Sequence, residues 1–160
     1  MKVAFWRRRV ASLGMVCMVA ACGTLTVMPG QSTLLPSIAA KTIAKRCSRP
    51  GPPPFEGTWT PDSNTITVME REFGAVRRLR SGCCVLGSRI SDLSDSYLQY
   101  VGIVANGRKL IYVNAFTGKD PPGLWRTHPV MICDGGTGAW GVVYDPGTRE
   151  FFDLAVNGIS

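Results

Sequence analysis

Histidine is nearly absent from this 160-residue sequence, and its only copy is His128. This histidine precedes a proline and has no neighbouring residue that would serve as its nucleophile, which argues against a histidine-dependent hydrolase. The sequence also lacks the C-x-x-C pairs typical of zinc sites and the Gly-Lys-Ser/Thr ending of a phosphate-binding loop. We therefore predict no enzymatic activity, no metal and no cofactor, with a hydrolase or thiol enzyme as the least favoured class.

Acidic residues are the minority charge, with 11 against 18 basic residues and a formal net charge of +7. Four basic residues, Lys2 and Arg7-Arg8-Arg9, lie in an N-terminal segment that we expect to be removed. Without these four, 14 basic residues face 11 acidic ones, a net charge of +3. This surplus is typical of a solvated surface and is weak evidence for nucleic-acid binding, which calls for a clustered basic stripe.

The apolar run 10–21 is about a dozen residues long, which is too short to span a bilayer. It follows the basic residues 7–9 and has the length of a signal-peptide core. It ends in Val19-Ala20-Ala21-Cys22, an aliphatic residue and two small residues before a cysteine. We therefore predict a signal peptide over residues 1–21 and export from the cytoplasm.

This ending resembles the lipobox of bacterial lipoproteins. The resemblance implies that Cys22 is acylated and becomes the mature N-terminus, anchored in a membrane. Gly23 stands where an Asp often marks retention in the inner membrane, so the resemblance favours an outer-membrane lipoprotein facing the periplasm or the cell surface. The alternatives are a plain secretory signal cut elsewhere and, less favoured, a twin-arginine signal at residues 7–9.

The cysteines outside the signal peptide and the lipobox are even in number: Cys47, Cys83, Cys84 and Cys133. In an oxidising compartment these four are candidates for disulfides. A bridge between adjacent cysteines is strained, so we expect Cys47 to pair with Cys83 or Cys84, and Cys133 with the other. The alternatives are a zinc site and a catalytic thiol.

Residues 22–55 have the composition of a flexible, lipid-attached linker, and the proline-rich run 48–54 should be extended. Within it, residues 37–46 are compatible with a short helix that places Ile38 and Ile43 on one side. Cys47 would attach the end of this linker to the globular domain, which we place at residues 56–160.

A hairpin is predicted over Tyr97–Phe116, where two apolar runs flank Asn106-Gly107. A two-residue turn fixes the register and pairs Leu98 with Ala115, Tyr100 with Val113 and Gly102 with Ile111. This face should meet the core, and Gly102 leaves room there for another element.

An amphipathic helix is predicted over residues 60–80, beginning at Thr60-Pro61 and ending at Ser81-Gly82. Its apolar stripe consists of Ile66, Met69, Phe73, Val76 and Leu79. The alternating, β-branched residues 65–68 favour a strand instead, but the longer pattern favours the helix.

Three short strands are expected after the hairpin, at residues 129–133, 139–144 and 149–156. Residues 145–148 suit a type II turn between the last two, which would place Gly141 and Val143 on one face with Phe152 and Leu154. The predicted fold class is α+β: one amphipathic helix packed on an antiparallel meander sheet of about five strands, preceded by a signal peptide and a Pro-rich linker.

Four short motifs in the C-terminal part are similar to those of small uncharacterised envelope proteins of proteobacteria: Cys133–Gly136, Trp140-Gly141, Tyr144-Asp145 and Asn157-Gly158. The resemblance covers about 60 residues. It implies an exported domain and no particular activity.

The candidate partner-binding residues are Trp125, Asp134, Gly135, Gly136, Trp140, Tyr144 and Phe151. The glycine-rich loop could bind an anion or be a tight connector, and the aromatic residues could form a contact surface or lie buried under the linker. We expect a lipid-anchored binding protein that contacts another envelope protein, as periplasmic inhibitors and immunity proteins do. The alternative is a structural or assembly lipoprotein of the outer membrane without a dedicated ligand.

Overall fold

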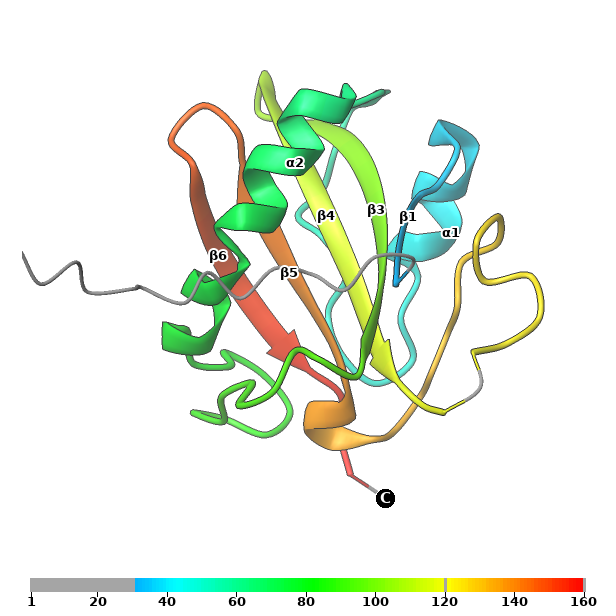
Figure 1. The fold of residues 1–160 in the computed structure, drawn as a ribbon, viewed down its shortest axis with the longest axis vertical. Coiled ribbons are helices and arrows are strands. Elements are labelled where there is room, and N and C mark those ends of the chain that lie inside the picture. Colours follow the sequence, from blue (N-terminus) through cyan, green and yellow to red (C-terminus); the bar gives the residue numbers. More distant parts are fainter. Residues whose placement is uncertain (1–30, 120, 160) are drawn as a thin grey trace, which may run out of the picture.

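The computed structural model describes residues 31–119 and 121–159 (Figure 1). The predicted signal peptide, residues 1–21, and the lipobox cysteine, Cys22, lie outside the described residues. Among the helices of the described residues, none combines the length and the apolar character needed to cross a membrane.

A mixed sheet of six strands forms the centre of the molecule, in the order β1-β3-β4-β5-β6, with β2 also paired to β3. The strands are β1 (Ser32–Leu34), β2 (Gly57–Trp59), β3 (Ser96–Ala105), β4 (Arg108–Thr117), β5 (Ala139–Asp145) and β6 (Glu150–Val156). Only β1 runs parallel to its neighbour; the other pairs described are antiparallel. The predicted α+β class is confirmed, and β3 to β6 form the expected meander.

Short helices flank the sheet: the α-helices α1 (Ala40–Ala44) and α2 (Ser63–Arg71), and the 3-10 helices η1 (Ser37–Ala39), η2 (Phe73–Arg78) and η3 (Gly136–Gly138). Figure 1 shows α2 crossing one face of the sheet, while α1 lies on the opposite side. Apolar side chains are buried on both faces, in a large cluster on the α2 side and in two further clusters on the other face.

The predicted hairpin register is confirmed, because Leu98 pairs with Ala115 and Gly102 with Ile111. Asn106 and Gly107 both have positive φ, 52° and 72°, as a tight hairpin turn requires. At Gly102 a side-chain carbon would overlap the carbonyl oxygen of Trp59. The missing side chain is therefore what lets β2 pair with β3.

The amphipathic helix is also confirmed, with different limits. Asp62 caps α2, and its carboxylate accepts a hydrogen bond of 2.7 Å from the Thr65 amide. The predicted start at Thr60 is wrong because Pro61 still packs against Gly102 at the end of β2. The helix gives way to η2 after Arg71, yet the predicted stripe stays in the core: Met69, Phe73 and Val76 are buried, and Ile66 and Leu79 pack against them.

Residues 31–55 are part of the folded domain, so their interpretation as a flexible linker is wrong. Leu35 and Ile43 are buried in the second cluster, against residues of β3 and β4 such as Val101 and Tyr112. The Leu35 amide donates to the Tyr100 carbonyl at 2.9 Å, which extends the β1–β3 pairing. Ile38 is 87% exposed and does not share the buried side of Ile43.

The disulfides join Cys47 to Cys133 and Cys83 to Cys84. The predicted long-range pairing of Cys47 with Cys83 or Cys84 is therefore wrong. Cys83 and Cys84 lie in a loop next to β6, where the Gly82 amide donates to the Leu154 carbonyl. The Cys47–Cys133 bridge closes a loop of 86 residues. By lowering the entropy of the unfolded chain it stabilises the fold by about 4–5 kcal/mol.

The C-terminal hairpin differs from the prediction in its turn and in its register. Arg149, and not Gly147, has positive φ, and its amide donates to the Asp145 carbonyl at 2.8 Å. The register shifts between Gly141 and Val143, opposite Asp153, which has a φ of 52°. This bulge moves Leu154 into the first core cluster. The predicted type II turn and the placement of Leu154 beside Val143 are therefore wrong.

Residues 129–133 do not form the predicted strand. The Val130 amide donates to the Gln99 side-chain oxygen at 2.8 Å, and the Val130 carbonyl accepts from Asn114 at 3.0 Å. Buried side chains of β3 and β4 therefore satisfy this backbone where a neighbouring strand was expected.

Replacement of Gly102 by alanine tests the close crossing of β2 over β3. We expect Gly102→Ala to lower the free energy of unfolding by about 1–3 kcal/mol, because the new methyl group overlaps backbone atoms. Gly74→Ala is the control, since among the described residues no atom outside its own helix and chain neighbours lies within 4 Å of the added carbon. Urea unfolding of both variants measures the difference, and equal stability of the two would contradict the crossing.

Candidate functional site

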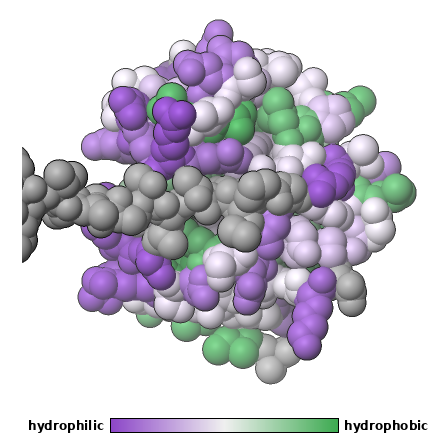
Figure 2. Space-filling model, in the orientation of Figure 1, coloured by the Kyte–Doolittle hydropathy of each residue, from purple (hydrophilic) through white to green (hydrophobic). Residues whose placement is uncertain are grey.

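Three of the predicted aromatic contact residues are buried together in the core. The rings of Trp140 and Phe151 lie next to Phe73 of η2, with the Phe151 centroid 5.0 Å from that of Phe73. Tyr144 packs on Phe151 in the same cluster. On the face shown in Figure 2, hydrophobic residues form small separate areas among hydrophilic ones. The prediction of an aromatic contact face is therefore wrong, and these rings are covered by α2 and η2, not by the proline-rich segment.

Trp125 lies elsewhere, in a small cluster with Tyr97 and Phe116 on the other face of the sheet. The glycine-rich loop, residues 134–138, does not contact the aromatic cluster through these bonds; it is hydrogen-bonded to Asn157 and Gly158 near the end of the chain. The Gly136 amide donates to the Gly158 carbonyl at 3.0 Å, and the Asp134 carbonyl accepts from the Asn157 amide group at 3.0 Å. These bonds favour a connector over an anion-binding loop.

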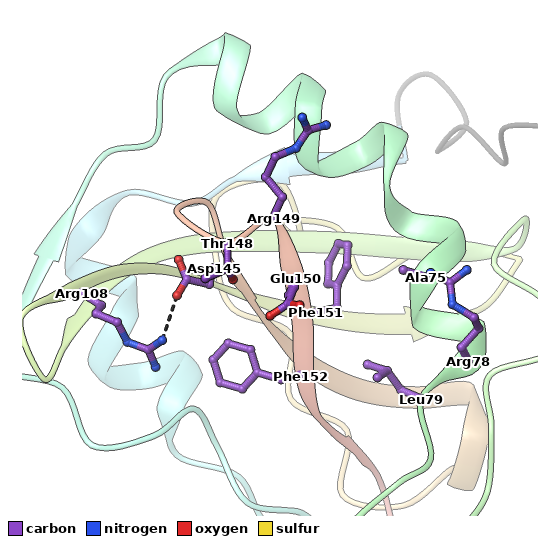
Figure 3. Close-up of a pocket in the computed structure, with 10 residues that line it drawn as sticks. All are labelled: Ala75, Arg78, Leu79, Arg108, Asp145, Thr148, Arg149, Glu150, Phe151 and Phe152. Atoms are coloured by element: carbon purple, nitrogen blue, oxygen red, sulfur yellow. Dashed lines mark hydrogen bonds and ion pairs between the residues drawn. The ribbon is translucent and has the colours of Figure 1, made fainter.

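Two adjoining hollows lie at the turn end of the sheet and share Arg108, Asp145 and Thr148. The first, shown in Figure 3, has a volume of 570 Å³ and extends over β6 to Arg78 of η2. The second has a volume of 600 Å³ and extends to Trp59 at the end of β2. We call the two hollows together the turn groove.

The apolar side chains of the turn groove come from β2, β6, the residue after η2 and the turn between β5 and β6. Leu79, Phe151 and Phe152 line the first hollow, and Trp59 and Pro146 line the second. Phe151 thus contributes to a hollow although most of its ring is in the core. The groove therefore offers apolar contacts along its length, from β2 to β6.

Basic side chains outnumber acidic ones along the turn groove. The lining includes four basic residues, Arg78, Arg108, Lys109 and Arg149, and two acidic ones, Asp145 and Glu150. Asp145 is buried and its carboxylate accepts from the Arg108 guanidinium at 2.9 Å and from the Gly147 amide at 2.8 Å. Asp145 and Arg108 thus largely offset each other, as do Glu72 and Arg149. Arg78 and Lys109 then stand against Glu150, which leaves a small positive surplus.

Two of the basic groups lie over aromatic rings. The Arg108 guanidinium is 5.9 Å from the centroid of Phe152, and the Lys109 ammonium is 5.4 Å from that of Trp59. The Trp59 ring is itself fixed, because its indole N–H donates to the Leu110 carbonyl at 2.9 Å. These contacts position the cations at the edge of the groove while leaving N–H donors available.

A buried tyrosine connects the groove to α2. The Tyr144 hydroxyl donates to Glu72 at 2.6 Å, and Arg149 donates to the other oxygen of the same carboxylate at 2.6 Å. Burial, with the Glu72 hydrogen bond as a second cause, holds the pKa of Tyr144 well above its usual value. The hydrogen bond to Glu72 also raises the pKa of Arg149. Tyr144 therefore stays protonated and positions a groove residue without being exposed.

The basic groove residues were missed in the sequence, although a signal was present. Arg108 and Lys109 directly follow the Asn106-Gly107 turn, and Arg149 closes the turn between β5 and β6. Pairing of Ile111 with Tyr144 brings these two turns to the same end of the sheet. Basic residues at two neighbouring turns could have indicated a shared site.

Comparison with protein-family models, curated proteins and solved structures gave no match. Among the described residues there is also no group of three or more His, Cys, Asp or Glu side chains arranged to hold a metal ion. The groove lining contains no histidine or cysteine. Its cations and apolar surfaces are suited to binding an extended acidic segment.

Proposed function

We propose that this protein is a lipid-anchored envelope protein that binds another envelope protein through the turn groove. The bound element would be an extended acidic segment that also carries an apolar or aromatic side chain. Such contacts are typical of inhibitors and immunity-type proteins, which present a surface to a target without catalysing a reaction. The observation that carries this proposal is that four basic side chains line the groove together with apolar ones.

The electrostatics of the groove support an acidic ligand. The side chains of Arg108 and Arg149 are 56% and 63% exposed even though each has an acidic partner within the protein. A guanidinium can donate to a second carboxylate in a bidentate arrangement, which gives direction as well as attraction. The partly exposed Leu79, Phe152 and Trp59 supply the apolar area that exposed ion pairs lack.

The location rests on the N-terminal sequence and on the cysteines. Basic residues, an apolar run and the lipobox ending at Cys22 support export and acylation. The Cys47–Cys133 disulfide is consistent with an oxidising compartment. An anchor at residue 22 would keep the domain, which begins by residue 32 with β1, close to a membrane surface.

Acylation is tested by metabolic labelling with a palmitate analogue. We expect label on the wild-type protein and its complete loss in Cys22→Ala, because the lipobox thiol is the proposed acceptor. Cys17→Ala is the matched control and should keep the label. Labelling that survives in Cys22→Ala would exclude the proposed anchor.

The groove is tested by in-cell cross-linking from a photoreactive residue placed at Thr148, which lines both hollows. We expect a discrete cross-linked partner whose yield falls about tenfold in a charge-reversed variant carrying Arg78→Glu and Lys109→Glu. Lys45→Glu, at the end of α1 on the opposite face, is the control and should leave the yield unchanged.

Equal cross-linking in the charge-reversed variant would contradict binding through the groove. The absence of any discrete partner would favour the alternative, a structural or assembly lipoprotein without a dedicated ligand.

A further inference from the structure

Two arginines, Arg46 and Arg49, lie on the face of the sheet opposite α2, on either side of Cys47 in the sequence. Arg49 is only 6% exposed, and its two terminal nitrogens donate to the side-chain oxygens of Asn157 and Asn114. Arg46 donates through one terminal nitrogen to the Val130 carbonyl at 2.9 Å. Both guanidinium groups therefore enter the protein between the N-terminal segment and the sheet.

Several donors of this pair have no hydrogen-bond partner among the described residues. They are Nε of Arg49 and both Nε and Nη2 of Arg46, all of them inaccessible to solvent. The hydroxyl of Tyr112, a residue of β4 that is 2% exposed, is a fourth such group. Buried N–H and O–H groups are rarely left in this state, because each loses its hydration without replacement.

Two of these groups, the Tyr112 hydroxyl and Nε of Arg49, lie above Gly141 of β5. A side-chain carbon at Gly141 would overlap the Tyr112 hydroxyl and would lie 3.1 Å from Nε of Arg49. Arg46 lies within hydrogen-bonding reach of the Tyr112 hydroxyl and close enough to Arg49 for the second charge to affect its ionisation. The absence of a side chain at Gly141 therefore leaves the cluster its space.

The charge of the cluster is uncompensated within the described chain. Burial lowers the pKa of Arg46 to about 10; Tyr112 opposes this shift and the charge of Arg49 adds to it. No carboxylate contributes to that shift. Two neighbouring buried cations without an acidic partner are costly, because the removal of their hydration is not repaid.

The chemistry of the free groups indicates the ligand. Every unpartnered nitrogen is a donor. The Tyr112 oxygen lies where it can accept from Arg46, but it cannot serve all of these N–H groups, and its own O–H still needs an acceptor. The site therefore needs a further acceptor. A water molecule accepts two hydrogen bonds and carries no charge, whereas an anion accepts several and offsets the two guanidinium charges. The two hollows of the turn groove involve none of these residues, so this site is separate from it.

We propose that the Arg46, Arg49 and Tyr112 side chains together bind a small monovalent inorganic anion, of about the size of chloride. This proposal does not depend on the turn groove or on lipid attachment. The bound anion would neutralise one of the two buried positive charges. It would thereby strengthen the attachment of the segment around Cys47 to β4 and β5.

Thermal unfolding of the oxidised full-length chain in sodium chloride and in sodium gluconate, at equal ionic strength, tests the site. We expect a saturable, chloride-specific rise in the melting temperature on the order of 3–8 °C. Tyr112→Phe and Arg46→Met should each lose most of that rise. Tyr97→Phe and Arg89→Met are the controls and should retain it.

The proposal would be overturned if chloride and gluconate gave the same melting temperature, or if Tyr112→Phe kept the full chloride effect. A readout independent of the variants' stability is anomalous scattering from wild-type crystals grown in bromide. A bromide peak between the Arg46, Arg49 and Tyr112 side chains is expected, and no peak there would count against the site.

Discussion

The Arg49 guanidinium is the interaction on which the arrangement of the domain depends, because it joins segments that are far apart in the sequence. It binds Asn114 of β4 and Asn157 after β6, and it brings with it the segment that carries Cys47. Asn114 in turn donates to Gln99 of β3 at 2.8 Å. Because each member of this buried network satisfies the next, the loss of one leaves the others without partners.

The hairpin of β3 and β4 is buried on both faces, because the N-terminal segment held by Arg49 covers the face opposite α2. This hairpin also links the network to the turn groove. The α2 side holds the larger apolar cluster, and the segment around α1 covers the other side. Asn114 lies in β4 at the network, whereas Arg108 and Lys109 begin the same strand at the groove. A rigid strand therefore carries the basic groove residues, which limits the conformational freedom that partner binding would cost.

Local patterns in the sequence predicted the elements well and their surroundings poorly. Asn106-Gly107 determined the hairpin register, and the stripe through Met69 and Phe73 identified the buried side of the helix, because both signals are local. The proline-rich segment looked like a linker because Arg49 bonds to asparagines that are far away in the sequence, and such contacts produce no repeating pattern of residues. Trp140 and Tyr144 looked like contact residues because the sequence did not show that α2 covers them.

Native-state hydrogen exchange of the Leu35 amide, which donates to Tyr100, tests most directly whether Arg49 holds the N-terminal segment on the sheet. We expect strong protection in the wild type. In Arg49→Met, protection of Leu35 should fall through a partial opening, while Val113 in the centre of the sheet keeps most of its protection. A Leu35 amide that exchanges in the wild type as fast as in an unfolded chain, or that is unaffected by Arg49→Met, would contradict this account.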